Sequence, residues 1–126
     1  MNSDAFAELE RKLNLALPLE YRQFLGAFPD DLRAVLANCG AEDYLFDNPH
    51  SVMMRTLACR RGPFYDTEFP DDYLCIGEDG FGNYYCLDTS RNPAAVMFFD
   101  HESDEFELKA GSITEWWPML VAELKR

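Results

Sequence analysis

Residues 73–108 read YLCIGEDGFGNYYCLDTSRNPAAVMFFDHESDEFEL, a stretch in which short apolar runs alternate with turn residues. Glycine occurs three times within residues 77–82, which indicates backbone angles that other residues disfavour. Turns are also indicated at residues 88–93 and 101–104. Because the links are short, the apolar runs between them are predicted to pair as three or four antiparallel strands.

Helical patterns fill most of the sequence before this stretch, because apolar residues recur there at intervals of three and four. The predicted helices lie around residues 6–14, 17–28, 31–39 and 49–60. The last of them follows Asn48 and opens with Pro49, which is a capping residue followed by a proline suited to the first helical turn. The first half of the chain is therefore predicted to be mainly helical.

Three further segments complete the predicted order of elements. Residues 43–46 could form a short edge strand, whereas residues 64–72 show no sustained period and are predicted to be a loop. Ser112 and Glu115 have the spacing of a capping box and predict the start of a last amphipathic helix. Pro118 falls in its first turns, so that helix is expected to start later or to bend there.

Length and charge limit the classes of partner. A chain of 126 residues is expected to fold as a single domain over residues 1–126, and 11 basic against 23 acidic residues give a net charge of −12. This charge disfavours nucleic acid and anionic membranes and suits a basic protein, although solubility alone also explains it. The first residues lack an uninterrupted apolar run, so we expect no signal peptide and a cytoplasmic location. A monomer or weak dimer is also expected.

Motifs that could carry chemistry each have a simpler structural interpretation. Residues 77–82, GEDGFG, lie between two strands without the lysine and helix of a phosphate-binding loop, so a turn is favoured. The acids of residues 100–107 alternate like calcium ligands but lack the EF-hand glycine and terminal glutamate, so a solvated turn is favoured over a divalent ion. His50 and His101 have no cysteine placed beside them by local sequence. We expect no catalytic residue, metal or cofactor, although abundant acids leave a hydrolytic carboxylate pair open.

The cysteines show no metal-binding or redox spacing. Cys39, Cys59, Cys75 and Cys86 include no C-x-x-C pair, which excludes a zinc ribbon and a thioredoxin-like motif. In a reducing compartment they are predicted to be free and partly buried. If the hairpin closes at residues 80–81, Cys75 and Cys86 face each other, and a cross-strand disulfide stays an alternative.

Four segments, in this order and spacing, resemble the SUKH superfamily, named for Syd, US-twenty-two and yeast cell-wall-regulator homologues. They are LPLEYRQFL at 17–25, YLCIGEDGFGNYYCLD at 73–88, AVMFFDHE at 95–102 and SITEWWPML at 112–120. The resemblance spans nearly the whole chain. Members commonly follow the first segment with an Asn-Gly-Gly turn, whereas residues 26–29 read GAFP here and lead into an additional predicted helix.

The resemblance implies an α+β fold, with a mostly antiparallel sheet of about four to six strands flanked by helices. Many bacterial members look like immunity proteins, which bind a toxin's effector domain and block it, while others are regulatory interaction modules. The expected function is therefore a non-catalytic protein-binding module that neutralises a cognate, basic toxin domain. The alternative is a regulatory scaffold with a cellular partner.

The expected partner-facing residues combine acids of the turns with aromatic side chains. Tyr84 and Tyr85 are adjacent on a strand, so one of them must lie on the sheet's outer side. Trp116 and Trp117 cannot easily both point inward, which leaves Trp117 for a partner. The full predicted set is Glu78, Asp79, Tyr84, Tyr85, Asp88, Asp100, Glu102, Asp104, Glu105 and Trp117.

Overall fold

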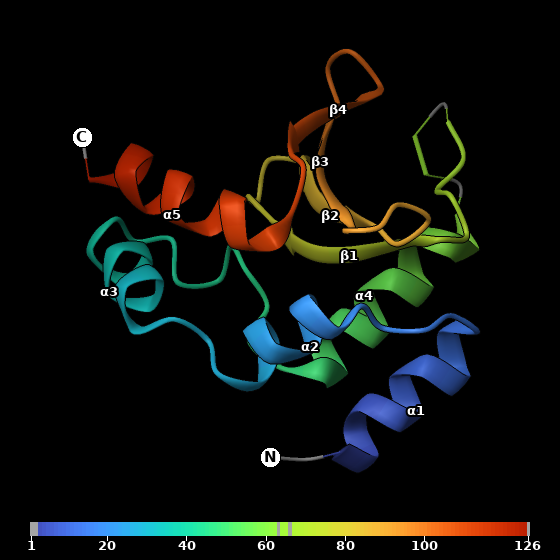
Figure 1. Ribbon diagram of the computed structural model, residues 1–126. Coiled ribbons are helices and arrows are strands. Elements are labelled where there is room, and N and C mark those ends of the chain that lie inside the picture. Colours follow the sequence, from blue (N-terminus) through green and yellow to red (C-terminus); the bar gives the residue numbers. More distant parts are fainter. Residues whose placement is uncertain (1–2, 63, 66, 126) are drawn as a thin grey trace.

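The computed structural model describes residues 3–62, 64–65 and 67–125, and in this part of the chain helices precede and follow one sheet (Figure 1). The helices are α1 (Ser3–Leu13), α2 (Leu19–Gly26), α3 (Asp30–Asn38), α4 (Pro49–Arg61) and α5 (Ile113–Leu124). The strands are β1 (Tyr73–Glu78), β2 (Tyr84–Asp88), β3 (Ala95–Asp100) and β4 (Glu105–Ala110). The predicted α+β class is confirmed, including the additional helix α3.

The sheet is antiparallel throughout, and its strands lie in the order in which they occur in the sequence, β1-β2-β3-β4. Cys75 pairs with Cys86 in the β1–β2 hairpin, Tyr85 with Phe98 between β2 and β3, and Phe99 with Phe106 between β3 and β4. Consecutive pairing follows from the short turns, which leave no room for a crossover. The strand count falls at the lower end of the predicted range.

The two faces of the sheet carry different apolar clusters. One face, with Leu74 and Val96, packs into the main core that the helices complete. On that side α4 packs on β1, α1 packs on α4, and α5 contacts α2, α3, β3 and β4. The opposite face, with Phe99 at its centre, is covered in part by Phe64 and Phe69 from the segment between α4 and β1. We call this second side the aromatic face.

The outer edge of β1 is closed by the residues expected to form a short edge strand. Leu45 forms an isolated bridge with Gly77, the Phe46 amide donates to the Ile76 carbonyl (3.0 Å), and the Glu78 amide donates to the Tyr44 carbonyl (2.8 Å). A Cβ on Gly77 would overlap the Tyr44 carbonyl oxygen. Glycine at this position therefore permits the close approach of the two backbones.

Helix α5 begins directly after its predicted cap. The Ser112 hydroxyl accepts a hydrogen bond from the Glu115 amide (3.2 Å), as expected for one half of a capping box. Glu20 of α2 accepts from the next free amides, those of Ile113 (3.0 Å) and Thr114 (3.4 Å). The helix then continues through Pro118, so the prediction of a later start is wrong.

The cysteines are free, although two of them face each other as the hairpin pattern predicts. Cys75 and Cys86 are register partners and fully buried, but the Cys75 thiol interacts with the Gly77 carbonyl (3.6 Å) and with Cys59. The hydrogen bond from Cys75 lowers the pKa of Cys59, and burial raises the pKa of Cys75. The alternative of a cross-strand disulfide does not hold in this structure.

Candidate functional site

Antiparallel pairing brings two acidic turns to the same end of the sheet. The β1–β2 turn spans residues 79–83, and the β3–β4 turn spans residues 101–104. The Asn83 side-chain oxygen accepts from the His101 backbone amide (3.0 Å) and lies 2.7 Å from His101 Nδ1. The two turns, though separated in sequence by both β2 and β3, are therefore joined through two side chains.

Asp79 fixes the conformation of the first turn. Its carboxylate accepts hydrogen bonds from the Phe81 amide (2.8 Å), the Asn83 amide (3.3 Å) and the Asn83 side-chain amide (2.8 Å). Gly80 and Gly82 have φ angles of 82° and 93°, which glycine adopts at little cost. Between these glycines the Phe81 side chain is 72% exposed. A constrained turn thus presents a large apolar side chain to solvent.

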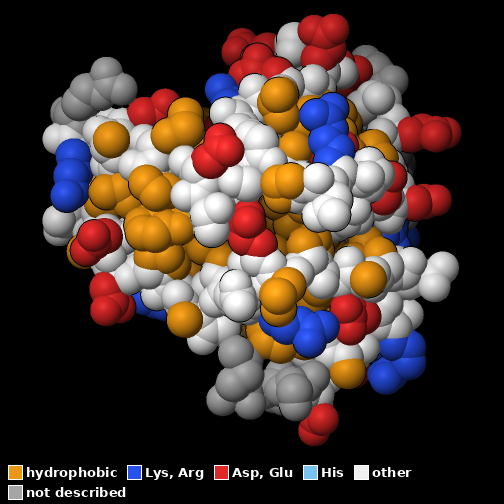
Figure 2. Space-filling model, in the orientation of Figure 1, with side chains coloured by type: hydrophobic (Ala, Val, Ile, Leu, Met, Phe, Trp, Pro, Cys, Tyr) orange, Lys and Arg blue, Asp and Glu red, His pale blue; other side chains and the backbone are white. Residues whose placement is uncertain are grey.

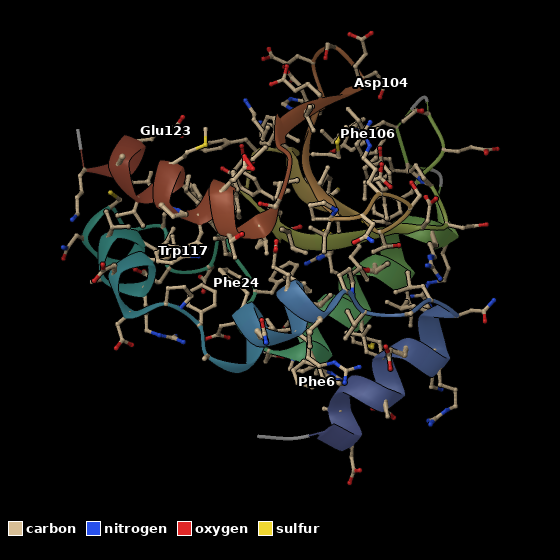
Figure 3. All side chains as sticks on the ribbon, in the orientation of Figure 1. Phe6, Phe24, Asp104, Phe106, Trp117 and Glu123 are labelled. Carbon is tan, nitrogen blue, oxygen red and sulfur yellow. The ribbon has the colours of Figure 1, made fainter. Side chains whose placement is uncertain are left out.

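The second turn presents carboxylates. Asp100 accepts from the Glu102 amide (2.9 Å) through its side chain and from the Asp104 amide (2.8 Å) through its carbonyl. The side chains of Glu102 and Glu105 are exposed. Figure 2 shows acidic side chains gathered at the top of the molecule, where Figure 1 places this turn. Figure 3 places Asp104 where this turn enters β4, above Phe106.

Tyr84 lies where the first turn meets the aromatic face. Its ring centroid is 5.3 Å from Phe64 and 6.4 Å from Tyr65, which is 44% exposed. These aromatic rings border a cavity of about 400 Å³, whose lining residues are Arg55, Ala58, Cys59, Phe64, Tyr65 and Tyr84. Burial raises the pKa of Tyr84, and Tyr65 adds to the effect, so the phenol stays neutral at physiological pH.

Glu78 has a cationic partner on α4. Its carboxylate lies 3.3 Å from the Arg55 guanidinium, and both side chains are partly exposed. An ion pair of this kind contributes little to stability because water screens it. Glu78 and Arg55 can therefore exchange this contact for one with a binding partner at small cost.

We call this end of the sheet the acidic edge. It comprises Tyr65, Glu78, Asp79, Phe81, Tyr84, Asp100, Glu102, Asp104 and Glu105. Exposed aromatic rings and surrounding carboxylates are held together there by hydrogen-bonded turns. Such a surface has the anchors and the charge needed to bind a basic protein.

A family model described as the SMI1 / KNR4 family (SUKH-1) matches residues 1–118 of the chain. The chain belongs to this family. The comparisons with curated proteins and with solved structures found no match. Membership of SUKH-1 confirms the resemblance inferred from the sequence and is consistent with a protein-binding module.

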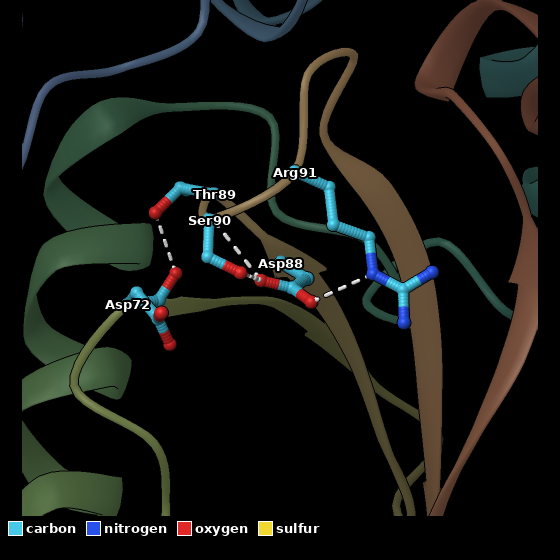
Figure 4. A network of polar contacts seen from close by, with 5 residues as sticks. All are labelled: Asp72, Asp88, Thr89, Ser90 and Arg91. Atoms are coloured by element: carbon cyan, nitrogen blue, oxygen red, sulfur yellow. Dashed lines mark hydrogen bonds and ion pairs between the residues drawn. The ribbon is translucent and has the colours of Figure 1, made fainter.

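In the SUKH-1 domain, Asp88 lies far from the other acids that were predicted to face a partner. Asp88 lies at the opposite end of β2, is only 5% exposed, and accepts from the Ser90 amide (3.0 Å) and from Arg91 Nε (3.1 Å). Figure 4 shows this network beside the Thr89–Asp72 contact, in which the Thr89 hydroxyl donates to the Asp72 carbonyl (2.6 Å). The Asp88 carboxylate thus orders the β2–β3 turn and lies outside the acidic edge.

Tyr85 and Trp117 also lie away from the acidic edge of the SUKH-1 domain. Tyr85 points to the helix-covered face, with its ring 5.5 Å from Trp116 and 5.2 Å from Phe98. Burial raises its pKa to about 12. Trp116 is buried in the main core and Trp117 is partly buried against the same core, so both tryptophans pack on it and the structure does not leave Trp117 open for a partner as expected. Of the adjacent tyrosines, only Tyr84 reaches the acidic edge.

Sequence reasoning left Phe81 and Tyr65 out of the predicted site. A signal existed for Phe81, because an aromatic residue between two turn glycines has no strand partner to bury it. No local signal existed for Tyr65, whose position depends on how the segment between α4 and β1 folds over the sheet. The contact between Asn83 and His101 depends in the same way on tertiary structure.

The described part of the SUKH-1 domain contains no group of three His, Cys, Asp or Glu side chains placed to hold a metal ion. Within residues 3–62, 64–65 and 67–125, no hydrogen bond joins a cysteine thiol to His50 or His101. No helix in those residues is both long and apolar enough to cross a membrane.

Proposed function

We propose that this SUKH-1 protein is an immunity protein, which binds and neutralises the effector domain of a cognate toxin in the cytoplasm without catalysing a reaction. The acidic edge is the observation that carries the proposal. Phe81 and Tyr65 are exposed there, and the two turns at this end of the sheet carry the carboxylates. Exposed aromatic anchors ringed by charge are typical of surfaces that bind proteins.

The chemistry of the partner follows from charge. The chain carries a net charge of −12, and the acidic edge concentrates several of those charges on two turns. A toxin domain that acts on nucleic acid must itself be basic to hold phosphates, so its substrate surface is complementary to the acidic edge. Electrostatic attraction between an acidic and a basic surface speeds association, which suits a protein that must bind a toxin before the toxin acts.

Binding to any toxin domain encoded beside this gene tests the proposal. The purified protein is titrated against that domain at low and at high salt, and the toxin's residual activity is measured in parallel. We expect tight binding and loss of toxin activity. High salt should weaken both the binding and the inhibition, because salt screens the contacts between carboxylates of the acidic edge and basic residues of the toxin. No binding and no protection would contradict the proposal, and recovery of only a cellular enzyme from the same organism would favour a regulatory scaffold.

Two matched variants locate the interface. Glu102→Lys reverses a charge on the acidic edge, while Glu8→Lys reverses an exposed charge on α1 and changes the net charge equally. We expect Glu102→Lys to weaken binding about tenfold and Glu8→Lys about twofold or less. Phe81→Ala should weaken binding by about tenfold to thirtyfold if Phe81 is an anchor. Equal effects of the two reversals would place the interface elsewhere.

A further inference from the structure

The two outer edges of the sheet differ. The edge of β1 is closed by the bridge between Leu45 and Gly77 and by the two flanking backbone hydrogen bonds. The edge of β4 is not covered, since among the described residues the backbone of Glu105–Ala110 forms hydrogen bonds only with β3. A strand in this position presents unpaired amides and carbonyls to solvent.

The side chains of β4 would give an added strand both apolar contact and charge. Phe106 and Leu108 pair with Phe99 and Met97 and so lie on the aromatic face, and Leu108 is 54% exposed. Glu107 pairs with Phe98 on the other face, and its side chain is 60% exposed. The outer edge of the sheet therefore offers an apolar row on one face and acids on the other.

We propose that β4 is a strand-addition edge, at which an extended basic segment of the partner protein pairs as a fifth strand. Its apolar side chains would cover Leu108, beside Phe106, which already packs against Tyr73 (ring centroids 5.0 Å apart), and its lysine or arginine side chains would face Glu105 and Glu107. The Glu107–Lys109 ion pair (2.9 Å) is exposed and adds little stability, so a basic residue of the partner can compete for Glu107.

The acidic edge supports this choice of occupant. β4 follows directly from the β3–β4 turn, so a segment paired with β4 continues onto Asp104 and Glu102. A second copy of this chain would bring another net charge of −12 to the same place, which like-charge repulsion disfavours. Charge complementarity therefore selects a basic strand from another protein. This inference rests on the proposed function, since it describes how the same partner binds.

A model strand tests the inference without the natural partner. The probe is a labelled peptide of alternating lysine and valine, about as long as β4, and its control has the central valine replaced by proline. Both peptides carry the same charge, but proline prevents regular strand pairing. Affinity is measured by fluorescence anisotropy, and amide hydrogen exchange of the full chain is followed by NMR with and without each peptide.

We expect the lysine–valine peptide to slow exchange of β4 amides, and the proline peptide to bind at least about fivefold more weakly without that protection. Glu107→Lys should weaken binding of the first peptide about tenfold, whereas Glu8→Lys should change it about twofold or less. Equal binding of both peptides, or protection elsewhere than β4, would overturn the inference. Concentration-dependent β4 protection without peptide would identify a second copy as the occupant instead.

The two proposals can fail separately. If Glu107→Lys leaves binding and neutralisation of the toxin domain intact, strand addition at β4 is wrong while the immunity function stands. If the peptide pairs with β4 but no toxin domain binds, the edge is real and the proposed function is wrong.

Discussion

At the scale of single residues, two acids of the acidic edge have different roles. Asp79 uses its carboxylate within the β1–β2 turn, where it accepts three hydrogen bonds. Glu102 has its backbone amide bonded to Asp100 while its side chain extends into solvent. Both were expected to face a partner from sequence alone, yet only the geometry shows that Asp79 first maintains the shape of the surface.

Replacing Asp79 therefore tests a structural role. We expect Asp79→Ala to lower the free energy of unfolding by about 1 kcal/mol, because it removes the acceptor of the Phe81 and Asn83 amides in a turn that water can reach. Glu102→Ala should change it by less than about 0.5 kcal/mol. Chemical denaturation followed by circular dichroism measures both. Equal stability of the two variants would contradict this role for Asp79.

The hydroxyl of Tyr21 is a second polar group that affects the stability of the fold. Its side chain is fully buried, and its hydroxyl has no hydrogen-bond partner among the described residues. Burial therefore raises the pKa of Tyr21 well above the usual value. The phenol stays neutral in the folded protein, whereas an unfolded tyrosine ionises at about pH 10, so Tyr21 causes no pH dependence of stability below that pH and lowers stability progressively as the pH rises above it.

We expect Tyr21→Phe to raise the free energy of unfolding at neutral pH by about 1 kcal/mol, because it removes a buried hydroxyl that lacks a partner. Between about pH 9 and pH 11 the variant should lose less stability than the wild type, since only the wild type can ionise this residue on unfolding. Denaturant titrations at several pH values measure the effect. Tyr65→Phe, at an exposed tyrosine, is the control, and a destabilised Tyr21→Phe variant would contradict the argument.

At the scale of elements, the beginning of α5 is supported by α2. Glu20 accepts from the Ile113 and Thr114 amides, which lie more than ninety residues away in sequence. A carboxylate at a helix N-terminus also interacts favourably with the helix dipole. The contact therefore ties the first helical half of the chain to its last helix.

We expect Glu20→Ala to lower the free energy of unfolding by about 1–2 kcal/mol, comparable with the loss of a helix cap. Glu20→Gln should retain much of this stability, because its carboxamide oxygen can still accept from the same amides. Thermal and chemical denaturation of the two variants decide the point. A Glu20→Ala protein as stable as the wild type would show that Ser112 alone is sufficient as a cap.

Local patterns predicted the elements well, because periodicity and turn residues act over a few positions. The cap at Asn48, the additional helix α3 and the hairpin that pairs Cys75 with Cys86 all follow from short-range signals. The predicted end of the second helix, at residue 28, was less accurate, because α2 ends at Gly26. Phe28 continues the apolar spacing beyond the helix and still packs on Phe24.

At the scale of the whole molecule, the reactivity of the four cysteine thiols depends on how deeply each is buried. Cys39 is exposed, whereas Cys59, Cys75 and Cys86 are buried. We expect a maleimide reagent to label one thiol rapidly in the native protein and the other three about a hundredfold more slowly, because they require opening of the core. Mass spectrometry after timed labelling measures this.

A Cys39→Ser variant is the control and should show no rapidly labelled thiol. After unfolding without a reductant, all four thiols of the wild type should react. Only two reactive thiols in that state would reveal a disulfide between Cys75 and Cys86 and contradict the free thiols of the structure.

The arrangement of the site could be predicted only in part, because it depends on contacts across the molecule. Sequence patterns identified the acids of both turns, but not the Asn83–His101 contact that joins those turns or the burial of Asp88. The segment that carries Tyr65 has no period, so its position over the aromatic face is set by Phe64 and Phe69 packing on the sheet. Each of these features requires the tertiary structure.

The closure of β1 by residues 44–46 has a consequence for stoichiometry. A sheet with two open edges can add strands in both directions and can thereby propagate into filaments. Here the approach permitted by Gly77 closes one direction, so this chain can accept an added strand at β4 but not at β1. Complexes formed through the sheet should therefore contain one partner per chain and should not polymerise.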